Sequence, residues 1–426
     1  MRSLADRVGS RTVFTSIVLQ NVRLGSSDTS SVSMGFRIFA FLALVFAVLT
    51  TVNAMNKGGD AAVFFEGGRR FLNAEPLYAG SSAAAGFIGP PFQAMFFTPF
   101  AAVSSLSPVA ARLIWHALSV ACLALSVAMT VGWWNAAREH EGLAPRSWLA
   151  LAGAPLAAVL LPLLTNFEHQ NLNAILLALL TAATWQLTLG SALVAGALVG
   201  AATALKVFPA LVILYFIARR YWAAATVAAL TAGGLSVVVP LGVYGVNGFV
   251  DLAQTFWRLS TSGWPVRGNN QSLVAAIDRL TSGANHAGVR LASEAPITMT
   301  VFVLMALLLL CALLAVMREQ RSTRMAVAVE MTAVTVLAIL LSPIAWDHYW
   351  TLLFPACVIA YDSRDRRLLG RAGAYAFWVA AILTTGLSPL TLGGAGFNVA
   401  RHVSMYTIAA IVIYLALLAL RRRVKV

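Results

Sequence analysis

Long apolar stretches recur along almost the whole chain, separated by short breaks rich in Arg, Pro or Gly. A helix needs about 20 apolar residues to cross the hydrocarbon core of a bilayer. The composition agrees, because 59% of the residues are apolar and 11% are charged, whereas soluble domains average about 45–50% and about 25%. Since a backbone in lipid must satisfy its own hydrogen bonds, repeated spans of this kind predict helices rather than open sheets. The sequence therefore predicts an all-α, polytopic transmembrane helical bundle.

The hydropathy pattern predicts about twelve membrane-spanning helices, with boundaries that are uncertain by a few residues. Residues 90–106 are also apolar, but the stretch is short and Pro99 interrupts it, so we expect it to dip into the membrane without crossing. The expected spans are 36–55, 109–134, 148–165, 172–188, 191–206, 207–218, 223–243, 297–317, 325–345, 349–361, 372–388 and 403–420.

The formal charge of +14 comes largely from basic clusters between the apolar spans. In a soluble protein such a charge would suggest nucleic acid, but in a membrane protein it is typical of cytoplasmic loops, and no nucleic-acid partner is expected. This predicts that both termini are cytoplasmic. The chain then divides into a cytoplasmic arm at 1–35, a single transmembrane domain at 36–420 and a basic cytoplasmic tail at 421–426. The clusters lie at Arg2–Arg37, Arg138–Arg146, Arg219–Arg220, Arg318–Arg324, Arg364–Arg371 and Arg421–Lys425.

The polar residues outside these clusters gather in segments that this topology places on the outer face. The two longest are the predicted extracytoplasmic loops 56–90 and 244–296. Cys122, Cys311 and Cys357 all fall inside apolar spans, so they predict neither a disulfide framework nor a paired-cysteine metal site. Residues 1–35 lack the apolar core of a cleavable signal peptide. We therefore expect the chemistry of a plasma-membrane protein on its extracytoplasmic side.

Asp60 directly follows the first apolar span. A carboxylate at the mouth of a bundle can take a proton from a sugar hydroxyl as that hydroxyl attacks. It can equally be an ordinary solvated loop residue. The other polar motifs decide between these interpretations.

Lys206 interrupts a long apolar run and lies three residues before Pro209. A lysine at membrane depth is costly and usually marks a functional site. The proline ends a helix there, which would bring the ammonium group to the outer headgroup level, where a phosphate is its natural partner. The alternative is a lysine that snorkels to the interface.

Two further polar segments interrupt the apolar pattern. Residues 166–173 include His169, Asn171 and Asn173, whose side chains suit hydroxyl-rich ligands because each offers both donors and acceptors; a polar hairpin tip is the alternative. Residues 341–349 place Asp347 and His348 at a helix break. These acids and imidazoles could hold a metal, but no ligand spacing requires one, and no phosphate-binding glycine loop is present. No metal or cofactor is predicted.

Together, these stretches resemble the family 87 glycosyltransferases, GT-C enzymes that use polyprenyl-phosphate sugars and include mycobacterial mannosyltransferases. The resemblance runs from about Gly59 to Pro355. The sequence departs from the family pattern at Ala74, at Gly89-Pro90-Pro91, at Asn171 and at Tyr349, which bears on the sugar and acceptor more than on the reaction type. The matching motifs are Asp60, Pro76-Leu77-Tyr78, Asn171-Leu172-Asn173, Lys206-Val207-Phe208-Pro209, Asn270-Gln271-Ser272 with Arg279, and Ser342-Pro343 with Trp346-Asp347-His348.

The resemblance implies an inverting glycosyltransferase that moves a hexose, mannose first among the candidates, from a polyprenyl-phosphate donor to a glycolipid or glycan acceptor. Asp60 would be the general base, and Lys206, with Arg279 or Arg258, would hold the donor phosphate. The residues expected to contact sugar or acceptor are Tyr78, His169, Asn171, Asn173, Asn270, Gln271, Asp347 and His348.

A secondary transporter or lipid flippase is the alternative from a different class. Broken helices and a buried lysine are also typical of transporters. The chain shows no internal repeat, however, and its polar residues gather on one face. A polymerase of lipid-linked glycans would share the same outer cavity. Membrane lipids are partners under each interpretation.

Overall fold

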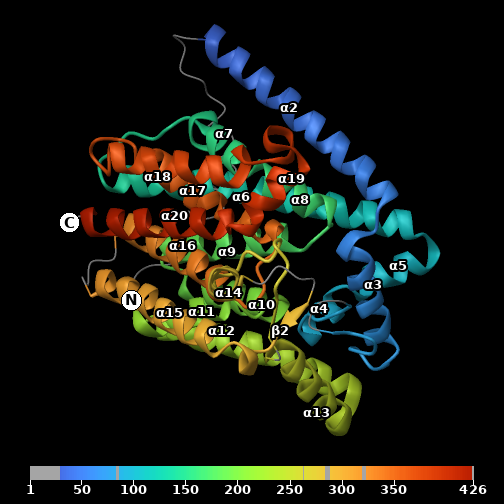
Figure 1. Ribbon diagram of the computed structural model, residues 1–426. Helices are drawn as coiled ribbons and strands as arrows, with labels where there is room; N and C mark the ends of the chain where they lie inside the picture. The colour runs from blue at the N-terminus through green and yellow to red at the C-terminus, as the bar shows by residue number, and fades with distance from the viewer. Residues whose placement is uncertain (1–28, 83–85, 262, 284–287, 319–322, 425–426) are drawn as a thin grey trace, which may run out of the picture.

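The computed structural model describes residues 29–424 except 83–85, 262, 284–287 and 319–322. Most of the predicted arm at 1–35 and the last two residues of the predicted tail lie outside this part of the chain. The described residues are overwhelmingly helical, with one short pair of strands. Figure 1 shows the helices and their order.

Six of the described helices or continuous helical runs are long and apolar enough to cross a membrane. The chain is therefore a multi-pass membrane protein, as predicted. They comprise α2 (Thr29–Asn56), α6 (Pro108–His140), α12 (Trp222–Gly233) continued through η2 (Gly234–Val238) into α13 (Val239–Thr261), α15 (Pro296–Met317), α16 (Arg324–Leu341) and α20 (Met405–Arg423).

Two bent helix pairs raise the number of spans to as many as eight if each pair is one span. The first pair, α7 (Trp148–Ala158) and α8 (Leu160–Glu168), is bent by 66°. The second joins α18 (Arg371–Ala381) and η5 (Ile382–Gly386) to α19 (Pro389–His402) at 88°. Proline explains both breaks, because Pro162 in the first turn of α8 cannot donate to Ala158 O and Pro389 opens α19.

The remaining helices are short. Several coincide with expected spans, yet α9 has only 16 residues and α11 only 9, so the predicted number of twelve crossings is not confirmed. Residues 90–106 form two short helices, α4 and α5, rather than one long helix. The short elements are α3 (Gly59–Leu72), α4 (Pro91–Phe96), α5 (Thr98–Leu106), α9 (Asn173–Thr188), α10 (Ala192–Leu205), α11 (Ala210–Ala218), α14 (Leu273–Ser282), η3 (Ala292–Glu294), η4 (Asp347–Leu353) and α17 (Phe354–Asp362), with strands β1 (Trp264–Pro265) and β2 (Val289–Arg290) paired antiparallel.

Helix α16 forms the centre of the bundle. Nearly all of its residues are buried, and it packs against α6, α9, α11 and α20. Small residues bring α10 and α12 together, since a Cβ on Gly196 would meet Ala224 O at 2.4 Å and one on Gly200 would meet Ala228 O at 2.6 Å. The small-residue packing expected of membrane helices is therefore present at Gly196 and Gly200.

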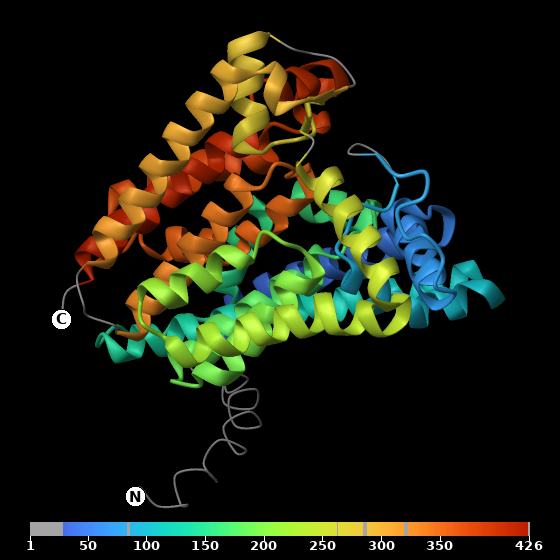
Figure 2. The same cartoon turned by 90° about the horizontal axis from the view of Figure 1, so that it is seen from below.

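Residues of several basic clusters form ion pairs with buried carboxylates at one end of the bundle. Arg138 forms a salt bridge with Asp362, and Arg146 contacts the same carboxylate at 3.5 Å. Arg219 and Arg421 both bind Glu330. In Figures 1 and 2 the C-terminus marks this end, and α3 lies at the opposite one.

Candidate active site

The site begins where α3 starts, at Gly59 and Asp60. Gly59 has φ +51°, and a Cβ there would meet His169 O at 2.5 Å, so only glycine fits. The next amide, Asp60 N, donates to the same His169 carbonyl at 2.7 Å. These contacts fix the first turn of α3 against the link between α8 and α9. Two segments more than 100 residues apart in the sequence therefore meet at Asp60.

The Asp60 carboxylate points toward three of the predicted side chains. Asn171 Nδ2 donates to Asp60 Oδ2 at 2.6 Å. His169 Nδ1 and His348 Nε2 lie 4.0 Å and 3.9 Å from its two oxygens, too far for hydrogen bonds. The carboxylate is 36% exposed. One oxygen is thus oriented by an amide, and the group remains accessible to a substrate.

Lys206 lies in the break between α10 and α11, outside the membrane-spanning helices. Its Nζ donates to Asn173 Oδ1 at 2.9 Å and to Asn171 Oδ1 at 3.3 Å. It also lies 3.5 Å from the centroid of the Tyr349 ring, a distance at which the ring face attracts a cation. The Asn171 side chain therefore bridges Asp60 and Lys206. Burial lowers the pKa of Lys206 to about 7, although the Asp60 carboxylate opposes this shift.

His348 lies in η4, directly after the Ser342-Pro343 break. Its side chain is buried, and its Nε2 has no hydrogen-bond partner among the described residues. Burial, together with the charge of Lys206, holds the pKa of His348 well below its usual value, so the ring is neutral near pH 7. A neutral imidazole beside Asp60 can exchange a hydrogen bond with a substrate hydroxyl.

The side chain of Asn173 forms its hydrogen bonds with other residues of the protein. Besides accepting from Lys206, it donates to Asn166 Oδ1 at 3.1 Å and to His348 O at 3.0 Å. It is completely buried. Its geometry is that of a residue that holds Lys206 and η4 in position, rather than one that reaches a sugar.

Four other predicted site residues do not contact Asp60 or Lys206 but bind the segments around Pro343 and Arg401. Asn270 donates to Pro265 O and Pro343 O, at 2.9 Å and 3.1 Å. Gln271 donates to Arg401 O at 2.7 Å, and Arg279 donates to Ser404 Oγ at 2.7 Å. The fourth, Asp347, binds the guanidinium of Arg401. Arg401 was not expected from the sequence.

Two other predicted residues lie elsewhere. The Tyr78 hydroxyl donates to Gly89 O at 3.0 Å, within an apolar cluster. Arg258 is exposed on α13. Among the described residues, no group of three or more His, Cys, Asp or Glu side chains is placed to hold a metal ion.

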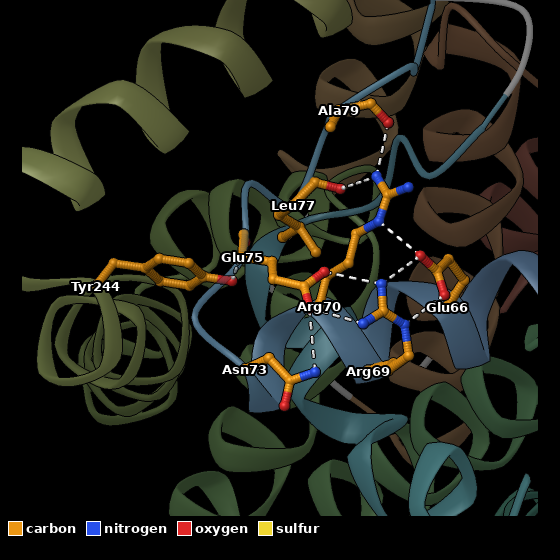
Figure 3. Close-up of polar contacts among 8 residues, drawn as sticks. All are labelled: Glu66, Arg69, Arg70, Asn73, Glu75, Leu77, Ala79 and Tyr244. Carbon is orange, nitrogen blue, oxygen red and sulfur yellow. Dashed lines mark hydrogen bonds and ion pairs between the residues drawn. The ribbon is translucent and has the colours of Figure 1, made fainter. Parts of the chain in front are cut away.

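The far end of α3 is held by a charge cluster, drawn in Figure 3. Arg69 binds both Glu66 and Glu75, at 2.8 Å and 2.7 Å. Arg70 binds Glu66 at 2.8 Å and donates to Ala79 O at 2.6 Å. The cluster ties the loop after α3 back onto the helix that carries Asp60.

Comparisons with known proteins identify the family of the chain. A family model, that of glycosyltransferase family 87, matches residues 87–343. The chain is 26% identical over 358 residues to a polyprenol-phosphate-mannose-dependent alpha-(1-2)-phosphatidylinositol mannoside mannosyltransferase of Mycolicibacterium smegmatis, covering 78% of this chain and 76% of that protein. It is 27% identical to the protein of the same description from Mycobacterium tuberculosis, over 70% of this chain and 69% of that one.

Among solved structures, the chain is similar to ArnT from Cupriavidus metallidurans bound to undecaprenyl phosphate. The TM-score is 0.41 and the identity 14%, over 93% of this chain and 78% of that one. A likeness of this size carries no argument about function.

Proposed function

Because this chain belongs to glycosyltransferase family 87, we propose that it transfers a hexose, mannose first among the candidates, from a polyprenyl-phosphate sugar to a glycolipid or cell-envelope glycan. The observation that carries this proposal is the Asn171 side chain, which binds Asp60 at 2.6 Å and Lys206 at 3.3 Å. A base and a cation thus share one site, as a transfer between an alcohol and a phosphate ester requires.

Asp60 acts as the general base in this scheme. Its free oxygen accepts the proton of the acceptor hydroxyl as the hydroxyl oxygen attacks the anomeric carbon of the donor sugar. Asn171 orients the carboxylate, and His348 holds a substrate hydroxyl beside it. The attack forms a new glycosidic bond on the face opposite the leaving group, so the anomeric configuration inverts.

Lys206 acts on the leaving group. As the bond between the anomeric carbon and the phosphate oxygen breaks, its electron pair goes to polyprenyl phosphate. The ammonium offsets this growing charge, and a cation that is already held in position is effective because it needs no reorganisation. Asn171, Asn173 and the Tyr349 ring hold Lys206 in place.

The relatives support the substrates. Their descriptions specify polyprenol-phosphate-mannose as donor and phosphatidylinositol mannosides as acceptors. Family membership and the shared base–cation site favour this enzyme over the transporter interpretation. We assign the donor phosphate to Lys206 rather than to Arg279, because Arg279 already donates to Ser404 and to the Asn270 carbonyl.

We place the active site on the extracytoplasmic side of a bacterial plasma membrane. Helix α3, which carries Asp60, lies at one end of the bundle, and the C-terminal end of α20, whose Arg421 binds Glu330, lies at the other (Figures 1 and 2). Since positive loops stay cytoplasmic, the Asp60 end faces outward. We also propose that residues 36–420 form one transmembrane domain.

The test is transfer by the purified protein from labelled polyprenyl-phosphate-mannose to an octyl mannoside. We expect labelled product, one polyprenyl phosphate released per transfer, and an anomeric configuration opposite to that of the donor. Product with the donor's configuration would contradict a single inverting displacement. Release of free sugar alone, with no transfer to any mannoside or membrane-lipid acceptor, would contradict the proposed function.

A further inference from the structure

A polar cavity lies between the start of loop 268–272 and the end of α19. It has a volume of about 460 Å³, within the range of about 300–1,000 Å³ that is typical of small-molecule sites. Asp60, Lys206 and His348 are not among the residues that line it. The lining residues are Gly268, Asn269, Asn398, Val399, Arg401 and His402.

The Asn270-Gln271-Ser272 motif and Arg279 do not line this cavity but hold the segments that do. Gln271 Nε2 donates to Arg401 O at 2.7 Å, and its Oε1 accepts from Tyr406 N at 3.2 Å. Arg279 donates to Ser404 Oγ, in a turn where Ser404 has φ +64°. The motif therefore fastens the loop at 268–272 to the turn between α19 and α20. Its role is to shape a pocket, which explains why it does not reach Asp60.

The lining suits hydroxyl groups better than a phosphate. Asn269 Oδ1 is buried without a hydrogen-bond partner among the described residues, and Asn398 is exposed to the cavity. An amide and an imidazole each offer a donor and an acceptor, as sugar hydroxyls do. The charge of Arg401 is already compensated, because its Nε donates to Asp347 Oδ2 at 2.7 Å. A neutral sugar is thus the occupant with matching chemistry.

Two contacts and one peptide bond link the cavity lining to the reacting groups. Arg401 lines the cavity and binds Asp347. His348 directly follows Asp347 in the chain, and its Nε2 lies 3.9 Å from Asp60 Oδ2. A chain of sugars whose terminal hydroxyl lies at Asp60 therefore has a second polar site close by.

We propose that this cavity binds a non-reacting sugar of the acceptor glycan. The proposal rests on the proposed glycosyl transfer and adds that the enzyme selects acceptors by length. Asn269, Asn398 and His402 hydrogen-bond the inner sugar, while Arg401 links this subsite to η4.

The test compares two acceptors, an octyl mannoside with one sugar and an octyl mannotrioside with three. We expect Asn398→Ala and His402→Ala each to raise KM for the trioside about 3- to 10-fold, as one lost hydrogen bond predicts. Their kcat values, and KM for the one-sugar acceptor, should stay at the wild-type level. Asn247→Ala, on an exposed residue of α13, is the matched control and should change neither constant.

Equal losses with both acceptors would show a general defect and overturn the subsite, as would unchanged KM for the trioside. Calorimetric titration of the trioside onto Asp60→Asn protein measures the subsite without any turnover. We expect weaker binding when Asn398→Ala is added, and unchanged binding would again overturn the inference. Absence of transfer by the wild type, with binding that depends on Asn398, would count against the proposed function alone.

Discussion

Three side chains where α3 begins are joined by hydrogen bonds in the order Asp60, Asn171 and Lys206. Asn171 donates to Asp60 and accepts from Lys206, so each charge is oriented while the amide lies between them. The residue types and the membrane setting made Asp60 and Lys206 predictable from the sequence. The family resemblance implied that they share one site, but the Asn171 bridge between them was not predictable, because it depends on how α3, α9 and α10 pack.

The ionisation of Lys206 predicts a pH dependence. Burial lowers its pKa to about 7, so the cation is present below that pH and is lost as the pH rises through it. We expect kcat/KM for the donor to fall above about pH 7. In Lys206→Arg the fall should move to higher pH, because a guanidinium stays charged. A pH profile of transfer checks this, and the same alkaline fall in both proteins would contradict the role of Lys206.

Gly59 makes the approach of α3 to His169 possible. In Gly59→Ala, the new Cβ would lie 2.5 Å from His169 O, which must displace Asp60. We expect a loss of transfer of at least about tenfold, since small displacements of reacting groups are costly. Gly142 is the control, because it has φ +68° but nothing within 4 Å of a new Cβ.

Gly142→Ala should lower the melting temperature through backbone strain alone and leave the transfer rate of the folded protein unchanged. Equal activity in Gly59→Ala and Gly142→Ala would show that contact with His169 does not position Asp60.

At the scale of elements, the hydropathy pattern located most helices to within a few residues, including α6, α9, α10 and α15. It could not say where a helix bends or whether a short apolar helix crosses the membrane. Nor could it show that α19 turns back at 88°. Arg401 was missed for that reason, although the basic pair Arg401-His402 directly before the last span was a usable signal.

The end of α3 offers a prediction about stability. Arg69 is 46% exposed and Arg70 is 23% exposed, and ion pairs gain more where water screens them less. Arg70 also donates to the Ala79 carbonyl (Figure 3). We therefore expect Arg70→Ala to lower the melting temperature of the purified protein more than Arg69→Ala does. The reverse order would show that the bonds of Arg69 to Glu66 and Glu75 dominate.

For the whole molecule, the class of protein followed from composition, whereas the direction of the bundle across the membrane stays a prediction from its basic clusters. Buried ion pairs such as Arg138 with Asp362 show these clusters meeting at one end. The cavity at Arg401 could not be foreseen, since loop 268–272 and α19 lie far apart in the sequence. Only folding places them together.

The orientation predicts which positions reagents can reach in intact cells. In a variant without the three native cysteines, Glu294→Cys should react with a membrane-impermeant maleimide. Glu294 is exposed and belongs to loop 244–296, which we expect on the same side of the membrane as Asp60. His140→Cys, exposed beside the basic loop at the other end, should react only after the cells are opened. Labelling in the opposite pattern would place the active site in the cytoplasm.

The most direct test of the base–cation site is the transfer rate of Asp60→Asn measured against Asp251→Asn. Asp60→Asn keeps the size of the side chain but loses its capacity to take a proton, whereas Asp251 is exposed on α13. We predict a fall of about 10²- to 10⁴-fold for Asp60→Asn and a wild-type rate for Asp251→Asn. Wild-type transfer by folded Asp60→Asn protein would contradict the account.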